Sequence, residues 1–113
     1  MKKGETEIKA HGLKTGLEKI GDEREEQIVK HGRTVYEDVL QNTKGQLAMA
    51  ASILCYDQEN CLQPEDIIEE HCPEGWDKTI WRKMVEKSYE ERLVIAGAMI
   101  AAELDRLTYK GLQ

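Results

Sequence analysis

The stretch that most constrains the fold runs from Ser88 to Tyr109 and reads SYEERLVIAGAMIAAELDRLTY. Ser88 and Glu91 have the spacing of a capping box, which begins a helix, and Gly111 marks the other end. Apolar and alanine side chains cover nearly the whole circumference between these ends. The stretch is too short for a membrane span, which needs about 20 apolar residues. We therefore expect the central helix of a bundle.

Glu103 lies on the shoulder of the apolar face of this helix. In one interpretation it forms a structural ion pair with Arg92, Arg106 or Arg24, as buried acids often do. In the other, an acid that faces the inside of a bundle is a metal ligand or a general base. The spacing leaves both interpretations open.

Length and composition predict a single all-α domain over residues 1–113, with a small core. The hydrophobic fraction is 40%, there is no Phe, and the β-branched residues do not alternate as they would in strands. A chain of 113 residues leaves apolar surface that is hard to cover alone, so self-association is expected. The net charge of -6 argues against nucleic-acid binding, which needs clustered Lys and Arg.

The polar start of the chain, MKKGE, lacks the apolar region of a signal peptide, so we expect a cytoplasmic protein that does not enter membranes. Three cysteines are an odd number and do not form a disulfide framework. Cys61, His71 and Cys72 suggest zinc only weakly, because a fourth ligand is missing. A Cys61–Cys72 disulfide requires a source that tolerates cytosolic disulfides, and Cys55 is interpreted as a small core residue.

The first part of the chain is expected to be peripheral. Gly12, Gly16 and Gly21 weaken any helix over residues 5–20, so we assign residues 1–21 to a peripheral segment and 22–109 to the bundle core. Asp22 is the expected N-cap of a helix that stops at Gly32. Glu23 and Glu26 share one face of that helix with Lys30, and are either surface charges or residues that face a metal.

A short helix, VYEDVLQ, is predicted after a Thr34 cap. Glu37, Asp38 and Gln41 place oxygen donors within one turn of each other. Oxygen ligands are those that Mg²⁺ prefers, so this segment is a weak candidate for a magnesium site.

A second buried helix is predicted over residues 46–59, with Asn42 or Thr43 as its N-cap. Its alanine-rich face should pack on that of the last helix, so that two long helices lie antiparallel with shorter helices around them. A short helix is predicted over 64–71, and residues 82–87 either begin the last helix or precede its cap. Trp76 and Trp81 are either a lid on the core or a surface on which a base stacks.

Several of these stretches resemble a family pattern. Small proteins common in phage genomes carry E-R-x-x-Q-I-x-x-x-G-x-T, an acidic H-D-D, G-E-L-A-x-A-A, a Trp-rich linker and R-D-L-V-K-A-G-A-L-I-x-A-E-I-x-R-L. The corresponding residues here are Glu23-Arg24, Gln27-Ile28, Gly32, Thr34, Tyr36-Glu37-Asp38, Gly45-Gln46-Leu47-Ala48, Ala50-Ala51, Trp76, Trp81, Glu91, Leu93-Val94, Ala96-Gly97-Ala98-Met99-Ile100, Ala102-Glu103-Leu104 and Arg106-Leu107. The pattern is similar to the all-α nucleoside triphosphate pyrophosphohydrolases, the MazG-like superfamily.

The resemblance implies a helical bundle completed as a homodimer or homotetramer, in which acids on facing helices hold Mg²⁺. It implies hydrolysis of an NTP or dNTP between the α- and β-phosphates to NMP and pyrophosphate. The metal ligands would be Glu23, Glu26, Glu37, Asp38 and Glu91, with Glu37 and Asp38 as the catalytic pair. Arg24 or Lys44 would lie near the phosphates, and Trp76 or Trp81 near the base.

The chain departs from the superfamily signature, E-E-x-x-E followed by E-x-x-D. Glu37-Asp38 with Gln41 is the nearest match to the first half, and no E-x-x-D follows Glu91. Gln46 replaces an expected glutamate and Ile95 an expected lysine. These departures support a second hypothesis, a catalytically degenerate oligomer that acts as a binding or interaction module.

Overall fold

The computed structural model describes residues 2–56 and 70–112, and their regular secondary structure consists of helices without any strand. Six helices have both ends in this part of the chain: α1 (Lys2–Ala10), α2 (Gly16–His31), α3 (Val35–Gln41), α4 (Gln46–Leu54), α6 (Lys78–Val85) and α7 (Tyr89–Gly111). The predicted all-α class is confirmed. None of the described helices is both long and apolar enough to cross a membrane.

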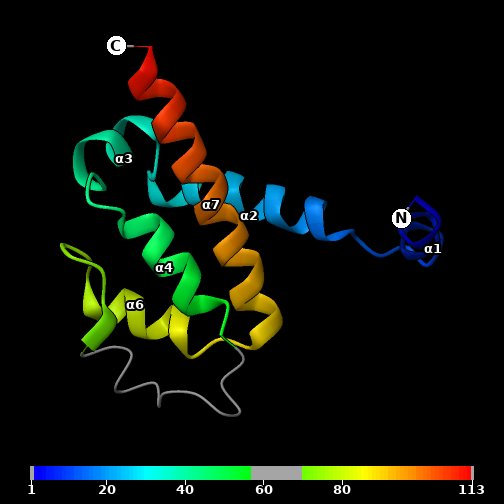
Figure 1. Cartoon of the computed structure of the whole chain (residues 1–113). Coiled ribbons are helices and arrows are strands. Elements are labelled where there is room, and N and C mark those ends of the chain that lie inside the picture. The colour runs from blue at the N-terminus through cyan, green and yellow to red at the C-terminus, as the bar shows by residue number, and fades with distance from the viewer. Residues whose placement is uncertain (1, 57–69, 113) are drawn as a thin grey trace.

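The central helix is α7, as the sequence predicts, and α2, α3, α4 and α6 all pack on it (Figure 1). The Ser88 hydroxyl accepts a hydrogen bond from the backbone N–H of Glu91 at 3.2 Å and donates to the Glu91 carboxylate at 2.8 Å. This cap fixes the first turn of a helix of 23 residues.

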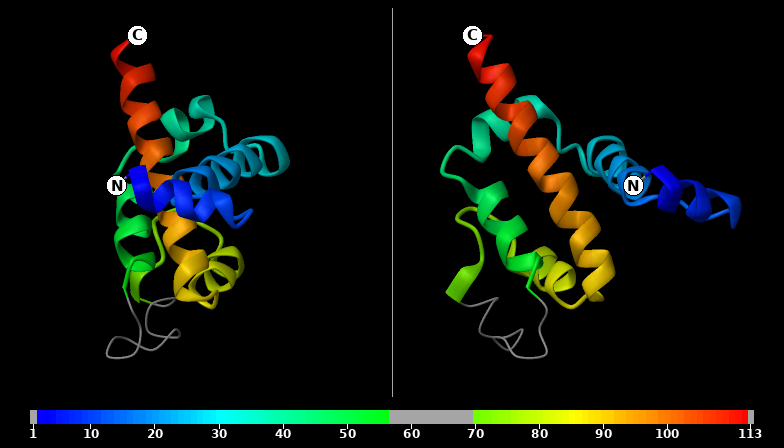
Figure 2. Two further views of the ribbon diagram at one scale, coloured as in Figure 1. Left: turned by 90° about the vertical axis from the view of Figure 1, so that its right-hand side faces the viewer. Right: turned by 45° about the vertical axis from the view of Figure 1, so that its right-hand side comes forward.

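The core lies where α4 and α7 run side by side in opposite directions, with α6 closing one end (Figures 1 and 2). The predicted packing of their alanine-rich faces is confirmed, because small side chains let the two helices approach closely. The buried cluster consists of Leu47, Ala50, Ala51, Leu54, Trp81, Met84, Val85, Ile95, Ala96, Met99 and Ala102.

α4 is shorter than predicted, because it ends at Leu54 instead of about Glu59. The buried guanidinium of Arg92, on α7, donates to the backbone carbonyl of Leu54 at 2.9 Å and also to that of Tyr56. These carbonyls, left over at a helix end, are thereby satisfied from outside the helix. Cys55 is exposed beyond this end, so its assignment to the core was wrong.

α2 begins earlier than predicted, at Gly16, with Thr15 instead of Asp22 as its N-cap. Thr15 and Glu18 form a full capping box, which offsets the helix-weakening glycines. Asp22 lies inside the helix and pairs with Lys14. The predicted boundary between residues 21 and 22 therefore falls within a continuous helix, which ends at Gly32 as expected (φ 62°).

The turns differ in detail from the predicted caps. Thr34 caps α3 as predicted, but α4 begins after Gly45, whose φ of 77° is left-handed, and not after Asn42 or Thr43. Asp77 caps α6, a separate helix over residues that the sequence placed in the last helix or before its cap. The predicted helix over 64–71, and the zinc and disulfide interpretations through Cys61, fall largely on residues outside the described ranges.

Candidate functional site

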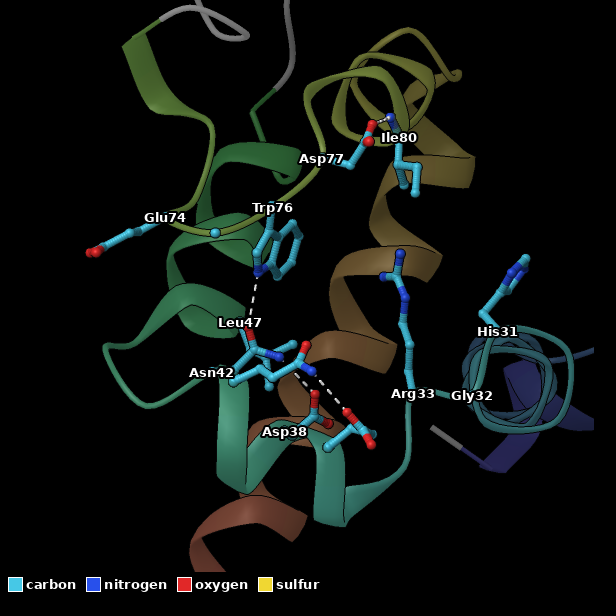
Figure 3. Close-up of a pocket in the computed structure, with 13 residues that line it drawn as sticks. His31, Gly32, Arg33, Asp38, Asn42, Leu47, Glu74, Trp76, Asp77 and Ile80 are labelled. Carbon is cyan, nitrogen blue, oxygen red and sulfur yellow. Dashed lines mark hydrogen bonds between the residues drawn. The ribbon is translucent and has the colours of Figure 1, made fainter.

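A cavity of about 610 Å³ opens between the end of α2, helix α3, the start of α4 and the beginning of α6 (Figure 3). Its walls carry carboxylates, amides, one guanidinium, one imidazole and one indole. The lining residues are His31, Gly32, Arg33, Glu37, Asp38, Gln41, Asn42, Leu47, Glu74, Gly75, Trp76, Asp77 and Ile80. Two of the sequence-predicted acids, Glu37 and Asp38, are therefore brought into one cavity with one of the predicted tryptophans, Trp76.

Asp38 is the most deeply buried acid of this cavity, with only 3% of its surface exposed. Its Oδ1 accepts a hydrogen bond from the Asn42 amide at 2.8 Å, whereas Oδ2 is buried and has no hydrogen-bond partner among the described residues. Burial raises the pKa of this carboxyl, and the Asn42 hydrogen bond and the charges of Arg24 and Arg33 offset part of that effect. An unsatisfied buried acceptor is costly unless something binds it.

Glu37 precedes Asp38 in the first turn of α3, where the helix dipole favours carboxylates. Thr34 accepts from the Glu37 backbone N–H at 3.2 Å, and the Gln41 amide donates to the Glu37 carboxylate at 2.9 Å. The cap and the amide together fix where this second acid stands. The two carboxylates and the carbonyl oxygens of Gln41 and Asn42 are a set of oxygen donors suited to Mg²⁺.

Trp76 is held rigidly at the other side of the cavity. Its indole N–H donates to the Asn42 carbonyl oxygen at 2.9 Å, so Asn42 links Trp76 to Asp38 (Figure 3). Trp81 contacts the Trp76 ring edge-to-face, with centroids 5.9 Å apart, and the Arg33 guanidinium lies 6.0 Å from the Trp76 centroid. A fixed aromatic ring beside a cation is a surface on which a nucleobase can stack.

The other predicted acids lie elsewhere, in a groove of about 440 Å³ between α2 and α7 that is lined by Glu23, Glu26 and Glu91 together with lysines. Glu91 and Glu103 lie about 18 Å apart along α7, at 1.5 Å per residue. Glu103 is near Asp38, because its charge contributes to the raised pKa of Asp38, so Glu91 lies far from that acid. The expectation of one acidic cluster built from all five acids is therefore wrong within a single chain.

Lysines and amides already compensate the acids of this groove. Lys30 lies 3.5 Å from the Glu26 carboxylate and Lys87 lies 3.9 Å from that of Glu91. The Gln27 amide donates to Glu23 at 3.2 Å. The serine hydroxyl at the α7 cap lowers the pKa of Glu91, which stabilises its carboxylate without a metal. No group of three or more His, Cys, Asp or Glu that could hold a metal occurs among the described residues.

The remaining predicted site residues have structural surroundings. Trp81 is fully buried in the core, so it cannot contact a substrate, and the lid interpretation holds for this residue. Arg24 is buried, donates to the Arg33 backbone carbonyl at 3.1 Å and lies 3.6 Å from Asp105. Lys44 pairs with Glu74 at 2.9 Å.

Glu103 forms a bidentate ion pair with Arg106, whose Nε and Nη2 each donate to one carboxylate oxygen, and this confirms the structural interpretation of that acid. Gln46 is also structural, although it stands where the family pattern has glutamate. Its side-chain NH₂ donates to the carbonyls of Gln41 and Glu74 at 3.3 and 3.4 Å, and its oxygen accepts from the Lys44 backbone at 2.7 Å. A glutamate would lack the two donated bonds.

Sequence reasoning missed Arg33, His31 and Asp77, and it assigned Asn42 to a helix cap. Their spacing gave no signal, because they come from three separate segments that meet only in the fold. No protein-family model, curated protein or solved structure matches this chain.

Proposed function

We propose that the cavity beside α3 binds the Mg²⁺ complex of a nucleoside triphosphate, and that the chain is a MazG-like pyrophosphohydrolase acting on NTP or dNTP in the cytoplasm. One observation carries the proposal. Asp38 lines a cavity of about 610 Å³ together with Glu37 and Trp76, and one of its carboxylate oxygens is buried without a hydrogen-bond partner among the described residues. The family pattern that the sequence resembles has acidic residues at the same two positions, Glu37 and Asp38.

The donor set fits magnesium. Mg²⁺ is often bound by only one or two carboxylates together with substrate phosphates and water, so a cluster of three protein acids is not required. Glu37 and Asp38 would hold it, and Gln41 and Asn42 supply further oxygen atoms nearby. Bound there, Mg²⁺ would neutralise the triphosphate and lower the pKa of a water.

The other residues of the cavity provide binding and orientation. Arg33, which lies near Trp76 and the end of α2, would meet the phosphate charge, and His31 lines the same cavity. The Trp76 ring supplies a flat surface for the base, and the Asn42 bridge keeps that ring and Asp38 in register. The products would be NMP and pyrophosphate.

A second candidate is a non-catalytic interaction module. It is favoured by the structural use of Gln46 and by the ion-paired acids of the α2–α7 groove. In that function the acids stabilise the fold, and the chain binds a partner as a homodimer or homotetramer without Mg²⁺.

The test is Mg²⁺-dependent pyrophosphate release from a panel of NTPs and dNTPs, with wild type, Asp38→Asn, Glu37→Gln and Glu91→Gln. We expect the first two variants to lose at least about tenfold in rate, because they remove metal ligands. Glu91→Gln should keep wild-type activity, since glutamine also completes a capping box and Glu91 lies in the other groove.

Direct binding of a non-hydrolysable triphosphate with Mg²⁺, followed by Trp fluorescence, separates binding from catalysis. Absence of both release and binding would overturn the proposal in favour of the interaction module. Equal loss in Glu91→Gln and Asp38→Asn would also overturn it, because it would place the site in the groove or in both locations.

A further inference from the structure

Three buried side-chain atoms have no hydrogen-bond partner among the described residues, and they belong to two side chains of opposite charge. They are Nε and Nη2 of Arg24, on α2, and Oδ2 of Asp38, on α3. The two residues are 8% and 3% exposed. A buried polar atom without a partner is costly, and a buried charge without one is more so. A cation and an anion in this position offset each other's cost if their charges interact.

The charge of Arg24 does act on Asp38. Burial raises the pKa of this carboxyl, and Glu103 on α7 adds to that effect. The Asn42 hydrogen bond and the positive charges of Arg24 and Arg33 lower the pKa, so they favour the carboxylate form. Arg24 is therefore a buried cation that helps to keep a buried acid ionised.

The other charged groups at this junction are less suited to balance Asp38. Arg106, on α7, also interacts with Asp38, but it is engaged in the bidentate ion pair described above. Arg33 lines the cavity, where the charge of a ligand would engage it. Asp105 lies 3.6 Å from Nη2 of Arg24, but its side chain is 54% exposed, so water screens that ion pair. The charge of Arg24 thus remains available to Asp38.

Two contacts fix Arg24 in this place. Its Nη1 donates to the backbone carbonyl of Arg33 at 3.1 Å, so the segment that joins α2 to α3 is tied to α2. Ile20 lies one helical turn before Arg24 on the same face of α2 and faces α7 at Gly97. A Cβ at Gly97 would lie 2.5 Å from Cδ1 of Ile20, so a glycine there lets α2 approach α7 closely (Figure 1). The face of α2 that carries Arg24 is thereby held against the bundle.

We propose that Arg24 is a positioning residue of the cavity, which balances the charge of Asp38 and holds the backbone at Arg33. Arg24 is not one of the residues that line the cavity, so it acts through these two residues instead of touching a ligand. The inference rests on the proposed function, in which Asp38 holds Mg²⁺ and Arg33 meets phosphate charge. It adds that a residue on α2 sets the fraction of Asp38 that is ionised at a given pH.

The first test measures the titration of Asp38 without any ligand, from its carboxyl ¹³C resonance, which Asp38→Asn identifies by its loss. Arg24→Gln should lower the acid dissociation constant of Asp38 at least about threefold, because it removes the neighbouring positive charge. Arg24→Lys keeps the charge and should restore the wild-type value. The control Asp105→Asn removes the ion pair with α7 but keeps the Arg24 charge, so it should not lower the constant. Circular dichroism checks that each variant folds.

The wild type supplies a second measurement, which does not depend on whether Arg24→Gln folds. The Arg24 Nε–H resonance, identified by its loss in Arg24→Lys, should follow the titration of Asp38 and lose this step in Asp38→Asn. A folded Arg24→Gln with an unchanged Asp38 constant, or an Arg24 resonance that does not follow Asp38, would overturn the inference. So would an Asp105→Asn that lowers the constant as much as Arg24→Gln does, because the ion pair with α7 would then be the cause.

Nucleotide binding separates this inference from the proposed function. For Mg²⁺ with a non-hydrolysable triphosphate, Arg24→Gln should raise the Kd relative to wild type. The factor should be larger at pH 5 than at pH 8, where Asp38 is ionised in both proteins, and Arg24→Lys should remove this pH dependence. An equal factor at both pH values would overturn the role of the Arg24 charge. A wild type that binds no nucleotide would refute the proposed function, whereas the titrations would still decide whether Arg24 balances Asp38.

Discussion

Asp38 is the side chain whose surroundings most oppose its own charge. One of its oxygens is satisfied by Asn42, and the other is buried without a hydrogen-bond partner among the described residues. Folding pays a free-energy cost to keep such an anion inside, and sites of this kind are commonly retained for binding instead of stability. A substitution of Asp38 should therefore have opposite effects on the stability of the fold and on its affinity for a ligand.

We therefore predict that Asp38→Asn stabilises the protein at pH 7 while it weakens Mg²⁺–nucleotide binding. The folded-state pKa of Asp38 is raised above its unfolded value, so its ionised form destabilises the fold above that raised pKa. The advantage of the variant should shrink as the pH falls through the folded pKa towards the ordinary value of about 3.9. Urea unfolding at pH 7 and at pH 4 measures the free energy of unfolding of wild type and variant at each pH.

An exposed acid supplies the control for this prediction. Asp22→Asn, on α2, removes a carboxylate that forms only a surface ion pair with Lys14, and should change stability little at either pH. A variant Asp38→Asn that is less stable than wild type at pH 7 would show that Asp38 contributes to the fold through its neighbouring arginines.

Among the helices, α3 is the element that joins the fold to the site. It has only seven residues, and a helix of this length depends on its cap and on packing against α7. Thr34 satisfies the first turn, which is the turn that carries Glu37 and Asp38. Ser88 performs the same capping role for α7, but its first turn lies away from the cavity.

Thr34→Ala and Ser88→Ala form a matched pair for testing this difference. Each should lower the free energy of unfolding by about 1 kcal/mol, the usual loss when a cap is removed. Only Thr34→Ala should also weaken binding of Mg²⁺–nucleotide, because it loosens the turn that positions the two acids. Calorimetric titration of both variants decides the point, and equal affinities would show that the cap does not position the site.

The whole molecule is thin, with a core of one layer that lies mainly between α4, α6 and α7. Large apolar side chains remain exposed on α7, and a partner that covers them would add to the burial that a short chain can achieve alone. Stability and assembly should then be linked, since a species that binds only the folded state raises its apparent stability.

This link predicts that the Tm of wild type rises with protein concentration, whereas the Tm of Ile100→Glu, a change at an exposed apolar residue of α7, does not. Thermal unfolding followed by circular dichroism over a hundredfold range of concentration is the measurement. A wild-type Tm that does not change with concentration would show that the stability of the fold does not depend on dimer formation. A rise of the same size in the variant would place the interface away from the exposed apolar side chains of α7.

Local signals predicted the elements well where one residue decides the outcome. The Ser88 cap of α7, the Thr34 cap of α3 and the left-handed Gly32 at the end of α2 are satisfied within five residues of chain. The errors came where distant groups compete. Thr15 with Glu18 outweighed Asp22 as a cap, and Arg92 ended α4 through a contact 38 residues away in the chain.

The candidate site divides in the same way. The sequence alone determined the all-helical class, the central helix and the local pair of Glu37 and Asp38, because each depends on periodicity or on neighbours within one turn. It could not determine which acids meet, since Glu91 and Asp38 are separated by most of the fold and their positions depend on how α2, α3 and α7 cross. The Asp38–Asn42, Glu26–Lys30 and Glu91–Lys87 contacts each span four residues and are local. Packing buried Asp38 and brought Trp76 to Asn42, 34 residues away in the chain. That burial and that long-range hydrogen bond arise only when the separate helices come together.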